Sequence, residues 1–184
     1  MTGLKQLQGG KVRNLSKACI FVTALLLSPA AHATLLDDGV AAYNRTDYET
    51  AVRIWKPLAQ QGAAKAQYNI GLMYDDGLGV PSDKSEAIKW YTRAARQGDE
   101  DAAFNLAIKY DNGEGIHANT QEALKWYKIA ASKGNARAQF NLAVMYLAGE
   151  QIPRDYREAT KWLTLAAHRG DTKAQYNLGL LYGE

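Results

Sequence analysis

The chain has 184 residues, with 22 Lys and Arg against 19 Asp and Glu, and a single cysteine at position 19. Four of the basic residues and none of the acidic residues fall within the first 33 positions, so the rest of the chain carries 18 basic and 19 acidic side chains. This near-neutral balance gives no electrostatic basis for binding nucleic acid or an anionic membrane. After position 33 there is no thiol, so apolar burial must hold the fold together, as about 150 residues can do.

The first 33 residues have the three-part pattern of a secretory signal peptide. A basic leader without acidic residues precedes an apolar run over 18–27, and Ala31-His32-Ala33 supplies small residues where a signal peptidase requires them. The apolar run is shorter than the roughly 20 residues that span a bilayer. We therefore expect cleavage after Ala33, a periplasmic or secreted location, and no stable membrane insertion of the mature chain.

Residues 34–62 resemble a tetratricopeptide helix pair. Tyr43 lies on the apolar stripe of a first short segment and Trp55 on that of a second, and Asp47 can cap the second segment. The turn between the two segments is four residues shorter than the corresponding turn later in the chain. We therefore treat this pair as the opening unit of a helical array.

From residue 63 onward one pattern recurs at an interval of 36 residues. The segment Ala-Gln-Phe-Asn-Leu-Ala at 138–143 has near copies at 66–71, 102–107 and 174–179. A period of this length is typical of stacked helical repeats. The predicted units are the repeats 63–98, 99–134 and 135–170 and a partial repeat 171–184.

Each full repeat is predicted to contain two helices with a side-chain cap at the start of the second. The capping pairs are Asp83 with Glu86, Asn119 with Glu122, and Asp155 with Glu158. Trp90, Trp126 and Trp162 follow a buried alanine on the packing stripe of these second helices. We expect the tryptophans to belong to the core rather than to a ladder that stacks sugars or bases.

This pattern resembles the Sel1-like repeats, a 36-residue relative of the tetratricopeptide repeat. The residues that carry the resemblance are Ala-x-Ala-Gln-Tyr-Asn-Ile-Gly-x-x-Tyr-x-x-Gly-x-Gly-Val at 64–80 and Asp-x-x-Glu-Ala-x-x-Trp-Tyr-x-x-Ala-Ala-x-x-Gly at 83–98. Gln151 departs from it, because a glycine is usual there. The resemblance implies an all-α, right-handed α-solenoid whose first helices line a concave face, and a role in holding other proteins together.

One stripe of each first helix is expected to face the groove of such an array. It gives seven candidate partner-binding residues: Lys65, Asn69, Asn105, Arg137, Asn141, Lys173 and Asn177. Asparagine can donate and accept hydrogen bonds with the backbone of an extended peptide, and the cations can pair with its carboxylates. The alternative left open is that the asparagines tie neighbouring helices together with or without a ligand.

No catalytic residue, metal site or cofactor is predicted. His117 and His168 have no second histidine or cysteine at ligand spacing, and the glycine turns follow a helix where a phosphate loop needs a strand. We therefore predict a non-enzymatic scaffold with a protein or peptide partner. The alternative is a cell-wall-related enzyme or ligand-binding protein, by analogy with cysteine-rich relatives credited with binding or hydrolysing β-lactams, although those cysteines are missing here.

The last helix ends the sequence in mid-repeat. Leu178, Leu181 and Tyr182 lie on it with no following partner in the sequence, and repeat arrays usually need a polar cap. We expect a homodimer through this C-terminal helix.

Overall fold

The structure, a computed structural model, describes residues 29–182. The helices in this part are α1 (Pro29–Asn44), α2 (Tyr48–Gln60), α3 (Ala64–Asp76), α4 (Lys84–Arg96), α5 (Glu100–Asn112), α6 (Thr120–Lys133), α7 (Ala136–Ala148), α8 (Tyr156–His168) and α9 (Thr172–Tyr182). No strand occurs between residues 29 and 182. Most of the predicted signal peptide lies outside the described residues, and α1 runs through the predicted cleavage site at Ala33.

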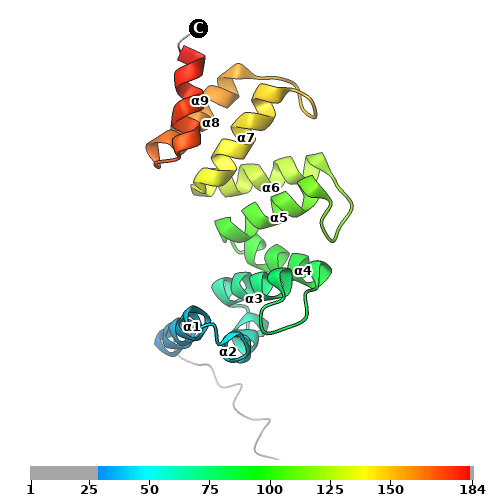
Figure 1. The fold of residues 1–184 in the computed structure, drawn as a ribbon, viewed down its shortest axis with the longest axis vertical. Helices are drawn as coiled ribbons and strands as arrows, with labels where there is room; N and C mark the ends of the chain where they lie inside the picture. The colour runs from blue at the N-terminus through cyan, green and yellow to red at the C-terminus, as the bar shows by residue number, and fades with distance from the viewer. Residues whose placement is uncertain (1–28, 183–184) are drawn as a thin grey trace, which may run out of the picture.

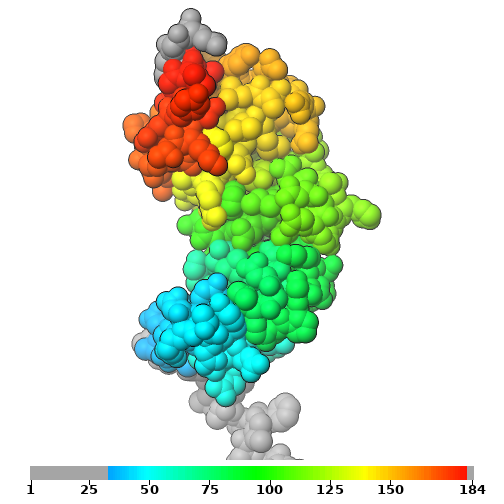
Figure 2. All heavy atoms as spheres, viewed as in Figure 1, coloured from blue at the N-terminus to red at the C-terminus, as the bar shows by residue number. Residues whose placement is uncertain are grey.

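The helices stack in chain order as an α-solenoid, as predicted. Each helix packs against the one before it and the one after it. In Figure 1 the two ends of the stack, α1 and α9, lie on the same side of the molecule, while α4 and α6 extend to the other side. The stack is therefore curved, and its outline in the space-filling view is hollowed between the blue end and the red end (Figure 2).

The side-chain caps predicted for the second helices are present, and the first helices α5, α7 and α9 have them too. Asp83, Asn119 and Asp155 accept hydrogen bonds of 2.9–3.1 Å from the third following amide at the start of α4, α6 and α8. Asp99, Asn135 and Asp171 do the same for α5, α7 and α9 at 2.8–2.9 Å. These bonds satisfy amides that have no partner within the helix, and only two or three residues separate one repeat from the next.

The tryptophans of the second helices belong to the core, as predicted. Trp90 and Trp126 are 4% and 7% exposed. Trp162 is partly buried and packs against two apolar clusters, one built from α4 to α7 and one from α7 to α9. The aromatic residues in phase on the first helices differ from one another, since Phe104 is buried and Tyr176 is 69% exposed.

The connections between helices vary where the sequence departs from the repeat. Three residues join α1 to α2, whereas seven join α3 to α4, which confirms the shorter first turn. Gly79 and Gly115 have positive φ values in their loops, but Gln151 at the equivalent place does not. The loop of the third repeat therefore follows a different backbone path.

The exposed apolar residues of α9 are not those that the sequence suggested. Leu178 and Leu181 pack against the apolar cluster of α7, α8 and α9, while Tyr176 and Leu180 are exposed. A homodimer through this helix stays a prediction.

Candidate partner-binding surface

Two of the predicted groove cations are joined through one carboxylate. Lys65 Nζ on α3 lies 3.5 Å from Asp101 Oδ2 on α5, and Arg137 Nη2 on α7 lies 3.8 Å from Asp101 Oδ1. Asn135 Nδ2 donates a hydrogen bond of 3.0 Å to the same Oδ1. Lys65 and Arg137 are therefore not independent free charges, because Asp101 offsets part of both.

Aromatic rings support the same two cations. Lys65 Nζ lies 4.7 Å from the ring centroid of Tyr68, and Arg137 Cζ lies 4.5 Å from that of Phe104. Cation–π attraction favours both placements. Burial, together with the charges of Asp101 and Asp99, raises the pKa of Tyr68 to about 12, so its hydroxyl stays protonated.

Two of the four asparagines tie neighbouring repeats together through tyrosines. Asn141 Nδ2 donates to the hydroxyl of Tyr127 at 3.3 Å, and this hydroxyl donates to Asp111 Oδ2 at 3.3 Å. Burial raises the pKa of Tyr127 to about 12, which keeps the hydroxyl a donor. One repeat earlier the hydroxyl of Tyr91 donates to Asp75 Oδ2 at 3.1 Å, and Asn105 lies near that hydroxyl, as Asn141 does near Tyr127. The structural role left open for the asparagines therefore applies to Asn105 and Asn141.

Asn177 is in a different setting. Its amide donates to the carbonyl of Lys173 in its own helix at 2.8 Å. In the third repeat, Leu147 stands at the place of Asp75 and Asp111, and Leu163 stands at the place of Tyr91 and Tyr127. Asn177 therefore has no phenol to bind, and its amide turns to the helix backbone.

Asn69 lies apart from the other groove residues. It borders a pocket of about 260 Å³ near the start of the array, with Tyr43, Trp55 and Leu72 in its wall. Among residues 29–182 its side chain makes no hydrogen bond within the chain. The pocket is mostly apolar, and Asn44 and Asn69 are the two amide side chains that line it.

A larger cavity brings three of the predicted groove residues together. It has a volume of about 370 Å³ and opens between α5, α7 and the start of α9. Arg137, Asn141 and Lys173 line it, with the rings of Phe104 and Phe140. Two cations, one amide and two apolar rings in one open cavity suit a segment that carries both apolar and acidic groups.

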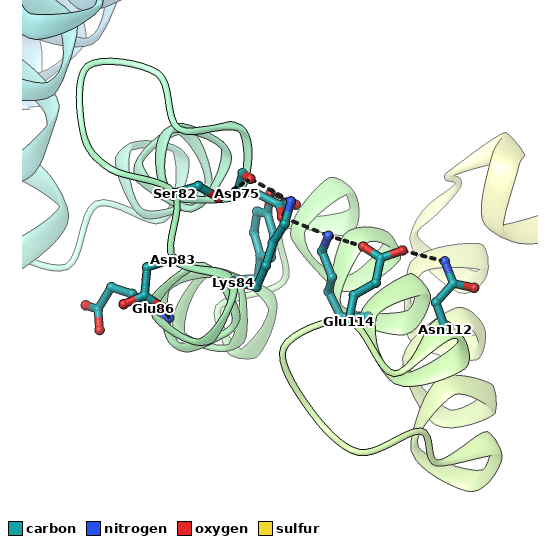
Figure 3. A network of polar contacts seen from close by, with 9 residues as sticks. Asp75, Ser82, Asp83, Lys84, Glu86, Asn112 and Glu114 are labelled. Carbon is teal, nitrogen blue, oxygen red and sulfur yellow. Dashed lines mark hydrogen bonds and ion pairs between the residues drawn. The ribbon is translucent and has the colours of Figure 1, made fainter.

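A buried ionic network, which the sequence analysis missed, joins the first two full repeats (Figure 3). Lys109 Nζ lies 2.8 Å from Asp75 Oδ1 and 2.7 Å from Glu114 Oε2, and its side chain is 7% exposed. Lys84 Nζ lies 2.7 Å from the same Asp75 Oδ1. Figure 3 shows Glu114 continuing the chain of contacts to Asn112, whose amide donates to it at 2.8 Å.

The charges of this network are set by pairing. Burial works against ionisation of Asp75, but hydrogen bonds from Lys109 and Lys84 outweigh it and lower its pKa. Burial likewise opposes the charge of Lys109, and the carboxylates beside it raise its pKa. Lys109 also lowers the pKa of Glu114. The network is thus fully charged at neutral pH, and it links α3 of the first full repeat to α5 of the second.

A signal for this network was present in the sequence. The four first helices have Met73, Lys109, Met145 and Leu181 in phase. A lysine in an otherwise apolar column indicates a buried charge that needs a partner. Its partner Asp75 lies in the preceding repeat, so comparison within one repeat could not find it.

Between residues 29 and 182 no cluster of three or more His, Cys, Asp or Glu is arranged to hold a metal ion. None of the helices described there is both long and apolar enough to cross a membrane.

Comparison with known proteins settles the family. The family model of the Sel1 repeat matches residues 64–99, 100–135, 136–171 and 172–184. The chain belongs to the Sel1 repeat family. Each matched repeat begins one residue after the boundary predicted from the sequence. Sel1 repeats generally serve as scaffolds for protein interactions.

Solved Sel1 repeat structures are similar to this chain. A Sel1 repeat protein from Oxalobacter formigenes is 36% identical with a TM-score of 0.78, over 81% of this chain and 61% of that protein. The protein c5321, a protective antigen in uropathogenic Escherichia coli strains, is 32% identical with a TM-score of 0.77, over 82% of this chain and 33% of its own. The chain thus spans less than two thirds of either relative.

A third structure shares the fold alone. The cysteine rich protein B of Helicobacter pylori is 16% identical with a TM-score of 0.58, over 72% of this chain and 95% of that protein. A search of curated proteins gave no match.

Proposed function

We propose that this Sel1 repeat protein is an exported, non-enzymatic adaptor that binds a segment of another protein along the concave face of its array. Export is supported by the basic leader, the apolar run and the small residues before position 34. Binding on the concave face is supported by one observation above others. Residues predicted from two successive repeats, Arg137, Asn141 and Lys173, line a single open cavity.

The charges on the second helices differ from those around this cavity. In α4, α6 and α8 a glutamate pairs with the lysine three residues later at 2.8, 3.1 and 2.9 Å. Lys125 and Lys161 also lie over the rings of Trp126 and Trp162. These lysines are satisfied within their own helix, so they have less to offer a partner than Arg137 and Lys173.

Reversing the charge at the two cationic residues of the cavity is expected to weaken partner binding strongly. In a pull-down from the periplasmic fraction, the Arg137→Glu/Lys173→Glu variant should recover at least about tenfold less of any partner that the wild type binds, because like charges at an interface cost several kcal/mol. Recovery is quantified by mass spectrometry, and circular dichroism checks that the variant is folded.

The matched control is the Lys125→Glu/Lys161→Glu variant, which makes the same change of charge on the second helices. It should recover the partner as the wild type does. If the cavity variant keeps every specific partner, the proposed binding face is wrong. Steady hydrolysis of a β-lactam or of peptidoglycan by the purified protein would instead favour the enzymatic alternative.

A further inference from the structure

We propose that the cavity between α5, α7 and α9 is a subsite for one acidic side chain, a glutamate or aspartate of the bound segment, held between Arg137 and Lys173. This inference rests on the proposed function and specifies the chemistry of the partner. The cavity would then be the place on the array that distinguishes a segment with an acidic side chain from one without it.

The charge pattern of the first helices singles out this cavity. The equivalent positions on α3, α5, α7 and α9 are Lys65, Asp101, Arg137 and Lys173. Asp101 lies between Lys65 and Arg137 and offsets both. The next pair, Arg137 and Lys173, has no acid between them in this series. Among residues 29–182, Lys173 has no carboxylate within 4 Å.

The guanidinium of Arg137 is available to a ligand. Its contact with Asp101 is 3.8 Å long, which is beyond hydrogen-bond distance. Within the described part of the chain its N–H groups donate no hydrogen bond. The planar fork of an arginine can bind both oxygens of a carboxylate. The position of Asp101 shows that this stripe of helices accommodates a carboxylate between cations.

The wall of the cavity holds the guanidinium in place before a ligand arrives. Arg137 Cζ lies 4.5 Å from the ring centroid of Phe104, which is itself buried. A side chain already oriented by a ring loses less conformational freedom when it binds. The ring of Phe140 also lines the cavity, and it can contact the methylene groups of an acidic side chain.

One carboxylate of the protein also lines the cavity. Asp171 Oδ1 accepts the amide hydrogen bond of Ala174 at 2.9 Å, at the N-terminus of α9. The positive end of the helix dipole offsets part of the charge of a capping carboxylate. The lining therefore keeps two cations against one engaged acid, and it favours an anionic group.

Two matched peptide pools test the proposal. The pools are fluorescent octapeptides, N-acetylated and C-amidated, with a central glutamate in one pool and glutamine in the other, and with no other acidic residue. Fluorescence anisotropy should show that the wild type binds the glutamate pool about tenfold more tightly, the effect of charge-assisted hydrogen bonds. The Arg137→Gln/Lys173→Gln variant should bind both pools equally, whereas Lys65→Gln should keep the preference.

Other outcomes would overturn the acidic subsite, its assignment to this cavity, or the proposed function. Equal binding of the two pools by the wild type overturns the acidic subsite and leaves the binding face intact. A glutamate preference that survives in the Arg137→Gln/Lys173→Gln variant overturns the assignment to this cavity. Tighter binding of the glutamine pool with a free C-terminus than of the glutamate pool assigns the cavity to a chain terminus and overturns the side-chain proposal. Failure of both capped pools to bind overturns the subsite and the proposed function together.

Discussion

Replacing Lys109 by leucine is expected to lower the free energy of unfolding by about 3 kcal/mol, because the largely buried Asp75 carboxylate loses its more buried cation and is only partly compensated by the one that remains. Lys109 is 7% exposed and pairs with both Asp75 and Glu114. Lys84, which is more exposed, is the one cation left beside Asp75 in the described structure. Urea denaturation of the wild type and the variant measures the loss.

Two repeats later, the chain has an apolar pair where Asp75 and Lys109 stand in the first two full repeats. Leu147 and Leu181 occupy the places of Asp75 and Lys109 two repeats later, and they pack in one cluster. The Asp75→Leu/Lys109→Leu variant should therefore recover much of the stability that either single variant loses, since apolar replacement of a whole buried pair is often neutral. Strictly additive losses in this double-mutant cycle would show that the two charges do not depend on each other.

The single Lys109→Leu variant should also change how the free energy of unfolding depends on pH. The pKa values of Asp75 and Glu114 are lowered in the folded protein. Their contribution to stability is thus present above the ordinary carboxyl pKa of about 4 and is lost as the pH falls through the lowered values. The stability gap between the wild type and Lys109→Leu should accordingly narrow in acid. A gap that stays constant down to pH 2 would contradict the assigned pairing.

Replacing Gly79 by alanine is expected to cost about 2 kcal/mol, because two penalties coincide there. The residue has a φ of +69°, and an added Cβ would lie 2.6 Å from the carbonyl carbon and oxygen of Tyr48. Backbone atoms at the start of α2 cannot move away without shifting the whole helix. Urea denaturation of the variant measures the cost.

Gly170 provides the matched control for this substitution. Its φ is +86°, but an added Cβ would meet nothing within 4 Å. Gly170→Ala should therefore cost about 1 kcal/mol, for the backbone conformation alone. If Gly79→Ala costs no more than Gly170→Ala, the close approach between this loop and α2 makes no energetic contribution.

The sequence predicted most of the fold because its signals are local and repeated. The 36-residue interval placed the helices, and capping residues such as Asp83 and Asn119 act on amides three positions away. The burial of Trp90 and Trp126 followed from their position on a helical stripe. Each of these inferences needed only the geometry of one helix pair.

The sequence predicted less of the candidate site because contacts between repeats are not local. The asparagine column suggested one common role, yet Asn141 binds a tyrosine of the preceding repeat while Asn177 binds its own helix. The difference follows from Leu163, which stands where earlier repeats have a tyrosine. Asp101 is another case, because its position between Lys65 and Arg137 depends on how three successive repeats pack and is seen only in the structure.

Photo-crosslinking from two equally exposed positions, one on a first helix and one on a second helix, shows whether the concave face binds a protein partner. Val144 on α7 and Leu165 on α8 are 40% and 41% exposed, and each is replaced in turn by a photoreactive amino acid in the exported protein. We predict a crosslinked partner from position 144 that disappears with Arg137→Glu/Lys173→Glu, and none from position 165. A partner crosslinked from position 165 alone, or equally from both positions, would contradict the account.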